Sequence, residues 1–231
     1  MKRFYRKAEL VRRASGCGIT LDGKPIKTPG KRDLVVPNEA LAAAIAEEWN
    51  AQEGVVRAAT MPLTRLATTT VDRVATQRDA IIRQTANYAA TDLVCYRATH
   101  PPGLAARQHA LWQPLIDWAV LHYDAPLSVT TGVIPTQQSA ASLRAFAVAV
   151  AEQDDFAVTA LHVTTAACGS LVIGLALIEG HLDAEGAFAL SQLDESFQIE
   201  AWGEDAEQVE RRRALAADIQ AAARFISLLR A

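Results

Sequence analysis

The fold is decided where one sequence pattern gives way to another, between I-T-L-D-G-K-P-I-K-T-P (residues 19–29) and N-E-A-L-A-A-A-I-A-E-E-W (residues 38–49). The first stretch alternates apolar and polar residues around an Asp-Gly pair, which is typical of a tight hairpin turn. In the second stretch, apolar residues recur every four positions from Leu41 to Trp49, which is a helical spacing. The sequence therefore predicts an antiparallel hairpin followed by a helix.

This junction divides the chain and sets its fold class. We predict an α+β protein with a small, basic, antiparallel β domain over residues 1–37 and a larger, mainly α-helical domain over residues 38–231. Asn38 has the side chain of a helix N-cap, and Gly54 is the residue type that ends helices. The first helix is therefore expected between them.

Apolar periodicity predicts helices along the rest of the chain. A second helix is expected to begin at Pro62, which suits a first helical turn, with an apolar stripe that continues to Tyr88. Further helices are predicted over residues 104–121, 143–150, 183–200 and 209–230, with an extended piece at Leu127–Ile134.

The segment Phe156–Ile178 contains no Asp, Glu, Lys or Arg and is long enough to be tested as a membrane span. It is interrupted at Gly169-Ser170, and its flanks carry neither basic anchors nor an aromatic belt. We therefore predict two buried core helices that meet near Gly169, and no membrane insertion.

The net charge of -3 conceals an asymmetry along the sequence. Residues 1–36 carry ten Lys or Arg against three acids, which gives +7 and leaves -10 for the remainder. We interpret the basic segment as a solvated basic face; an acidic partner, nucleic acid and a targeting leader are the alternatives. Because the segment has no aromatic residue after Phe4 and Tyr5, nucleic-acid binding is not predicted.

No pattern in the sequence predicts a catalytic, cofactor or metal site. Gly16-Cys17-Gly18 lacks the third glycine of a dinucleotide loop, and the five histidines lack metal-binding spacing. The three cysteines form no C-x-x-C pair, so we expect reduced thiols in a reducing compartment. A covalent site at Cys168-Gly169-Ser170 is disfavoured because it lacks the G-x-S-x-G elbow.

Acidic residues are concentrated near the end of the chain. From Asp183 to Glu210 there are nine carboxylates and no Lys or Arg. Such a run is interpreted as a solvated helix face or as a docking surface for a partner protein. The alternative is a small-molecule enzyme that uses Asp194 or Glu195 as a general base. Because nothing else resembles a reaction site, docking is the favoured functional interpretation.

Several phrases together resemble one protein family, and they span nearly the whole chain. In order they are R-F-Y-R-K (3–7), L-D-G-K-P-I-K-T-P (21–29), L-A-A-A-I-A-E-E-W-N-A-Q (41–52), M-P-L-T-R-L-A (61–67), T-D-L-V-C-Y-R-A (91–98), W-Q-P-L-I-D-W (112–118) and D-E-S-F-Q-I-E-A-W-G (194–203). This set is similar to the assembly chaperones of the F-type ATP synthase alpha subunit, also called assembly factor 2, of mitochondria and alpha-proteobacteria.

The resemblance implies a fold, a function and a partner. The fold is a small N-terminal β domain before a helical domain. The function is to hold the newly made alpha subunit until it pairs with beta, without nucleotide hydrolysis, enzymatic activity or a cofactor. The resemblance also implies partner-binding residues in the acidic helix, with Glu195 the first choice. They are Asp194, Glu195, Gln198, Glu200, Trp202 and Gly203.

One departure from the family pattern falls at Cys168, which stands where a small residue is more usual; we expect packing to accommodate it. The resemblance begins at Arg3, which favours a bacterial cytoplasmic protein, whereas eukaryotic relatives would lie in the mitochondrial matrix. We expect the free protein to be monomeric.

Overall fold

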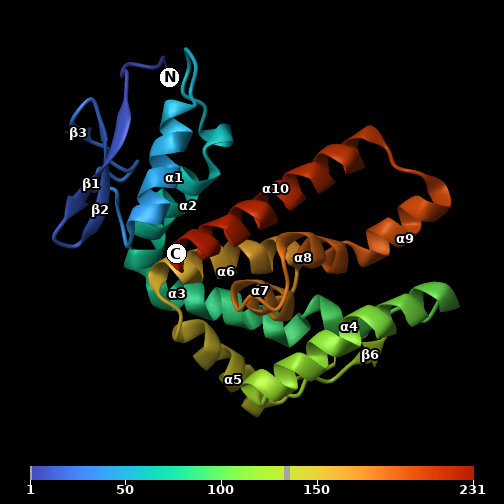
Figure 1. Ribbon diagram of the computed structural model, residues 1–231. Helices are drawn as coiled ribbons and strands as arrows, with labels where there is room; N and C mark the ends of the chain where they lie inside the picture. Colours follow the sequence, from blue (N-terminus) through green and yellow to red (C-terminus); the bar gives the residue numbers. More distant parts are fainter. Residues whose placement is uncertain (1, 133–135) are drawn as a thin grey trace.

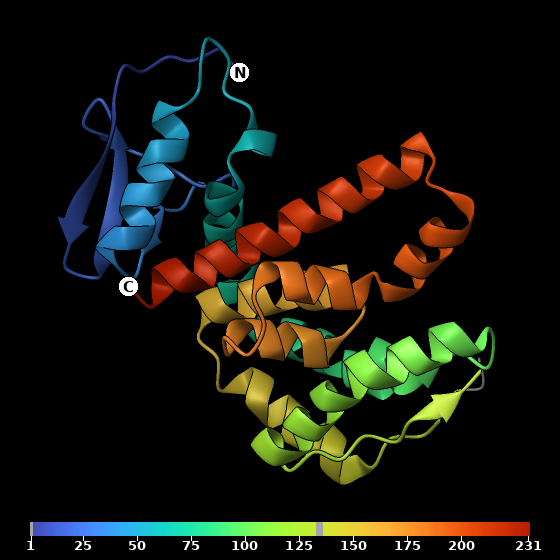
Figure 2. The same cartoon turned by 45° about the vertical axis from the view of Figure 1, so that its right-hand side comes forward.

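The chain folds into a small sheet at one end and a body of packed helices (Figures 1 and 2). This computed structural model describes residues 2–132 and 136–231. Helix accounts for 64% and strand for 11%, and the sheet precedes the helices along the chain. The predicted fold class is confirmed.

The N-terminal sheet is antiparallel, and its second strand pairs with the other three. Its strands are β1 (Ala8–Arg13), β2 (Gly16–Leu21), β3 (Lys24–Pro25) and β4 (Val35–Val36). Asp22 and Gly23 connect β2 to β3 with φ of 49° and 81°, the left-handed values that a tight hairpin turn requires. The predicted hairpin is confirmed.

Helix α1 (Glu39–Asn50) packs against β1 and β2. As predicted, the Asn38 side chain caps it by accepting a hydrogen bond from the backbone N–H of Leu41 at 3.0 Å. The helix ends at Asn50, so the predicted end at Gly54 is wrong. The Asn50 side chain instead exchanges two hydrogen bonds with the backbone of Ala8, which ties the end of the helix to the sheet.

The remaining helices form the body. They are α2 (Pro62–Thr69), a π-helical turn (Thr70–Val74), α3 (Ala75–Ala86), α4 (Pro102–Tyr123), α5 (Ala140–Ala151), α6 (Asp155–Cys168), α7 (Leu171–Ile178), α8 (Ala184–Ser191), α9 (Leu193–Trp202) and α10 (Ala206–Leu229). Among the described residues, 3-10 turns lie at Ala58–Thr60, Asn87–Thr91 and Leu93–Cys95.

The extended piece predicted at Leu127–Ile134 contains a strand. Residues Thr130–Thr131 form β6, which pairs in parallel with β5 (Tyr96–Arg97). Residues 133 and 134 of that prediction lie outside the described residues.

Two predicted helices are interrupted. The stripe from Pro62 changes phase at the π-helical turn, where the buried Thr70 hydroxyl bonds to that of Thr159 at 2.7 Å. The predicted helix Asp183–Glu200 is divided at Gln192, whose φ of -111° and ψ of 25° separate α8 from α9. Periodicity misses both changes because the apolar spacing on either side stays helical.

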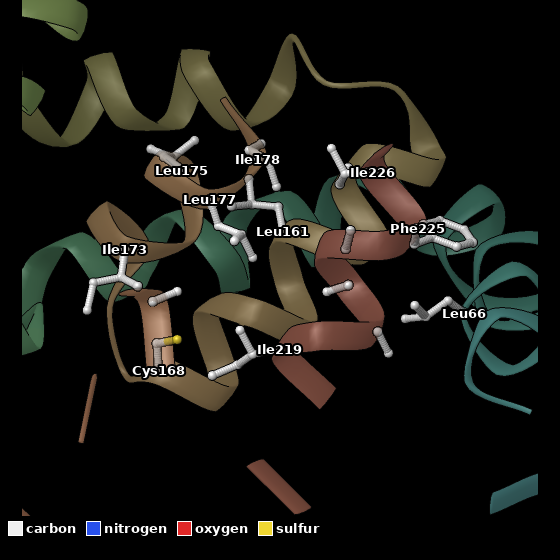
Figure 3. Packing of buried hydrophobic residues seen from close by; sticks show 14 of the residues in the cluster. Leu66, Leu161, Cys168, Ile173, Leu175, Leu177, Ile178, Ile219, Phe225 and Ile226 are labelled. Atoms are coloured by element: carbon white, nitrogen blue, oxygen red, sulfur yellow. The ribbon is translucent and has the colours of Figure 1, made fainter. Parts of the chain in front are cut away.

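The core is centred on α6, α7 and α10 (Figure 3). The two buried helices meet as predicted at Gly169, whose φ of 64° ends α6, and every residue of α7 is buried. No helix in the described parts of the chain is long and apolar enough to cross a bilayer. The same buried cluster continues to Ile19 in the sheet, and the division at residue 37 stays a prediction.

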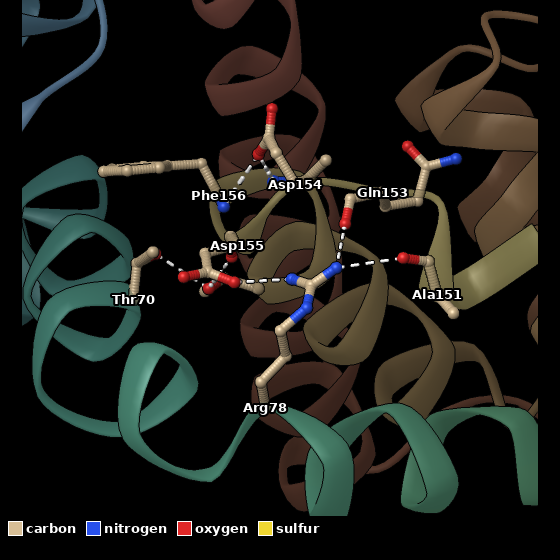
Figure 4. A network of polar contacts seen from close by, with 9 residues as sticks. Thr70, Arg78, Ala151, Gln153, Asp154, Asp155 and Phe156 are labelled. Carbon is tan, nitrogen blue, oxygen red and sulfur yellow. Dashed lines mark hydrogen bonds and ion pairs between the residues drawn. The ribbon is translucent and has the colours of Figure 1, made fainter.

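A polar network fixes α3 against the connection between α5 and α6 (Figure 4). The Arg78 guanidinium forms an ion pair with Asp155 and donates to the carbonyls of Ala151 and Gln153, at 2.9 and 2.6 Å. These contacts satisfy carbonyls near the end of α5, which no intrahelical donor reaches.

Candidate partner-binding site

The six predicted site residues lie on α9 and its C-cap, at the opposite end of α10 from the sheet (Figures 1 and 2). Helix α9 begins after the break at Gln192 and ends before Gly203, whose φ of 82° suits glycine. The chain then turns into α10, which Asp205 and Gln208 cap reciprocally. We call these two helices the α9–α10 pair.

Asp194, in the first turn of α9, is half-buried and directed toward α4. Its Oδ1 accepts a hydrogen bond from the Gln108 side-chain amide at 2.7 Å. The Gln108 carbonyl oxygen in turn accepts from the backbone N–H of Ala98 at 2.6 Å. Asp194 therefore anchors α9 to the helical body through a buried glutamine.

Glu200 makes the second anchor, at the other end of α9. Its two carboxylate oxygens accept hydrogen bonds from the Arg107 guanidinium of α4, at 2.7 and 2.9 Å. This bidentate contact holds the pKa of the Glu200 carboxyl below its ordinary value. The same guanidinium lies 5.2 Å from the centre of the half-buried Phe197 ring.

Contacts across the α9–α10 pair involve the arginines of α10. Glu195 lies 3.9 Å from the Arg211 guanidinium, a long ion pair between partly exposed side chains. Arg212 is more buried; it pairs with Glu204 at 3.3 Å and donates to the Ser196 hydroxyl at 3.1 Å. Glu195 is therefore held loosely, whereas Arg212 helps to close the turn between the two helices.

The remaining candidates face solvent. Gln198, Trp202 and Gly203 are all exposed, and the Trp202 side chain is 81% exposed. An indole left in water at a helix end is unusual, because burying an aromatic side chain is among the largest favourable contributions to folding and binding. Trp202 is therefore available to a partner.

In the folded protein, arginines from other parts of the chain neutralise some of the negative charge of the acidic run. Glu200 meets Arg107 of α4, and Glu204 and Glu210 meet Arg212 and Arg213 of α10. The pairing of Glu210 with Arg213 can be predicted from the sequence, because residues three positions apart on a helix are neighbours. Nothing in the sequence indicates that Arg107 reaches Glu200, because the two are 93 positions apart.

The enzyme alternative finds no geometric support. The cavity beside Glu195 measures about 30 Å³, roughly the space of one water molecule, and Asp194 does not line it. Burial raises the pKa of the Cys168 thiol to about 12, so it stays protonated and unreactive. Over residues 2–132 and 136–231, no group of three or more His, Cys, Asp and Glu is placed to hold a metal ion.

Sequence reasoning missed Arg97, which lies close to Asp194. The side chain is 7% exposed, and none of its guanidinium nitrogens has a hydrogen-bond partner among the described residues. It packs over the Trp112 ring at 5.2 Å. Burial lowers the pKa of Arg97.

The fold and the open helix surface of α9 define a mainly helical protein suited to contact with another protein rather than to small-molecule chemistry. The family model "ATP12 chaperone protein" matches residues 2–120, slightly more than half of the chain. The chain belongs to the ATP12 chaperone family, whose members are non-enzymatic assembly factors of ATP synthase. The family predicted from the sequence is confirmed.

Solved structures agree with this assignment. The crystal structure of Atp12 from Paracoccus denitrificans is 42% identical, with a TM-score of 0.95 over 99% of this chain and 98% of that one. The Atu1473 protein of Agrobacterium tumefaciens is 39% identical, with a TM-score of 0.94 over 99% of this chain and 86% of that one. A curated relative, the mitochondrial protein atp12 of Schizosaccharomyces pombe, is 25% identical over 223 residues, 90% of this chain and 77% of its own length.

Proposed function

We propose that this ATP12-family chaperone binds the unassembled alpha subunit of the F-type ATP synthase through the outward face of α9. The observation that carries the proposal is Trp202, a largely exposed indole at the end of a helix that also presents Glu195 and Gln198. Exposed aromatic residues beside charged ones are the usual anchors of protein interfaces.

The two ends of α9 have different tasks in this proposal. Asp194 and Glu200 hold the helix against α4, and Gly203 permits the turn that leaves Trp202 outside. Glu195, with its long ion pair, exchanges Arg211 for a basic group of the alpha subunit. The chaperone thereby covers a surface that the beta subunit later buries, without consuming nucleotide.

The test is capture of the alpha subunit when the two chains are expressed together. Glu195→Lys and Trp202→Ala should each reduce the yield of soluble, co-purified alpha subunit, because one reverses a charge at the contact and the other removes its apolar anchor. Two exposed positions away from α9 provide matched controls, Glu152→Lys after α5 and Leu121→Ala on α4.

Unchanged capture by Glu195→Lys and Trp202→Ala would show that α9 is not the binding surface. Failure of the unaltered protein to capture any alpha subunit would show that the alpha subunit is not its partner. Localisation in the bacterial cytoplasm and a monomeric free state stay predictions, which fractionation of the native organism and light scattering would check.

A further inference from the structure

A second candidate for binding lies at the other end of the molecule, between the sheet and the first two helices. A cavity of about 350 Å³ opens there, within the size range of pockets that hold small ligands or side chains. Residues 26–29 after β3 form one wall, and Trp49 of α1 with Met61 and Thr64 at the start of α2 form the other.

The walls of this cavity are fixed by buried polar contacts. The Glu48 carboxylate accepts hydrogen bonds from the backbone N–H groups of Leu63 and Thr64, at 2.7 and 2.8 Å, and from the Thr64 hydroxyl at 2.7 Å. These bonds hold the start of α2 against α1. Because the walls are held in this way, the cavity exists before any ligand arrives.

The Trp49 ring is a fixed part of the cavity wall. Its indole N–H is buried and has no hydrogen-bond partner in the described parts of the chain. The ring cannot easily turn away, because Tyr5 packs edge-on against it at 5.6 Å and donates its hydroxyl hydrogen to the Trp49 carbonyl. The ring therefore offers a fixed aromatic surface to an apolar group of a ligand.

The charge of the cavity points to an anionic ligand. Lys27 and Arg65 line it, and none of its described lining residues is acidic. These two cations form ion pairs with Asp33 and Asp218, and the side chains in both pairs are about half exposed. Exposed pairs contribute little to stability, so a carboxylate on a ligand can replace them at low cost.

Residues from three of the sequence phrases that resemble the family line this cavity, and the α9 surface does not explain those phrases. The phrases at residues 21–29, 41–52 and 61–67 lie far apart in the chain, and each contributes lining residues. The ATP12 family model matches residues 2–120, which include the whole lining and exclude α9.

We propose that this cavity is a second binding site, which takes an apolar side chain and a neighbouring carboxylate from an extended segment of the unassembled subunit. The identity of that subunit rests on the proposed function; the chemistry of the site does not. The apolar side chain fills the space beside Met61 and the Trp49 ring, and Lys27 and Arg65 receive the carboxylate.

A test that needs no partner protein uses octanoate, which joins an apolar chain to a carboxylate. Titration should shift the Trp49 indole N–H signal in the proton–nitrogen NMR spectrum, with that signal assigned by its loss in Trp49→Phe. Ala58 is an exposed lining residue, so Ala58→Trp fills the cavity and should abolish the shift. The adjacent exposed Ala59 does not line it, so Ala59→Trp should keep the shift.

Capture of the alpha subunit then tests the partner. Ala58→Trp should reduce capture by about tenfold relative to Ala59→Trp, because one large buried apolar side chain contributes about that factor to binding. An octanoate shift that is absent, or that persists in Ala58→Trp, would overturn the site. Equal capture by the two variants would overturn its role in holding the subunit. Octanoate binding by a protein that captures no alpha subunit would refute only the proposed function.

Discussion

Helices α7 and α9 are similar in length, but they differ in how far their residues are buried. All eight residues of α7 are buried, whereas Leu193 alone is buried among the ten described residues of α9. Packing on every side fixes α7 in the core. Helix α9 is held by a few polar contacts to α4 and α10, and four of its ten residues are exposed while five are half-buried. Helix α7 is therefore part of the core, and α9 is the helix that we propose for partner binding.

The largest loss of stability is expected from a substitution in α7. Replacing the fully buried Ile173 by Ala should lower the free energy of unfolding by about 2–5 kcal/mol, because it removes apolar contacts and leaves a cavity. Chemical denaturation would measure the loss. The matched variant is Ile199→Ala on α9, which truncates a half-buried isoleucine and should cost a small part of that amount. Equal losses in the two variants would contradict the contrast between the helices.

A smaller loss of stability is expected at Asp92, a carboxylate that caps the 3-10 turn Leu93–Cys95 and also binds the first turn of α7. Asp92 is fully buried and accepts hydrogen bonds from the backbone N–H groups of Val94 and Val172, at 3.2 and 3.1 Å. Asp92→Ala leaves those two donors without partners and should cost about 1–3 kcal/mol at pH 7. Equilibrium denaturation against pH would measure both the loss and its pH dependence.

The pH dependence has a defined sign. Burial raises the pKa of Asp92 to about 6 in the folded protein, from about 3.9 in an unfolded chain. The folded state therefore binds the proton more tightly, so this residue adds stability at low pH that is lost as the pH rises from about 4 to about 6. The gap between the wild type and Asp92→Ala should narrow over that range. A gap that widens would show that the carboxylate is stabilised as an anion.

The contrast between the two helices also explains what the sequence predicts well. Helix α7 lies in a stretch without charged residues, and Gly169-Ser170 marks its start, so composition and turn signals place it correctly. The sheet turn at Asp22-Gly23 and the cap at Asn38 follow from local backbone chemistry in the same way.

The surroundings of α9 are not predictable in this way. Its acidic residues follow from the sequence, but their partners Arg107 and Gln108 come from α4, and no local pattern brings the two helices together. The break at Gln192 also carries no turn signal, since it is neither a glycine nor a proline. The cavity beside Trp49 depends on three separated segments and appears only once they are folded.

The smallest effect on global stability is expected where α9 meets α4. Arg107→Ala removes the bidentate contact to Glu200 and the contact with the Phe197 ring, both at an exposed edge of the body. Because exposed ion pairs contribute little, the denaturation midpoint should stay unchanged. The backbone amides of α9 should nevertheless exchange hydrogen faster in native conditions, while those of α7 keep their protection, since α9 opens locally without unfolding the core.

Arg144→Ala on α5, an exposed arginine with no ion-pair partner among the described residues, is the control and should change neither helix. Accelerated exchange in α7 as well would mean that α9 is part of the core's cooperative unit, and the proposed distinction between a structural helix and a partner-binding helix would fail.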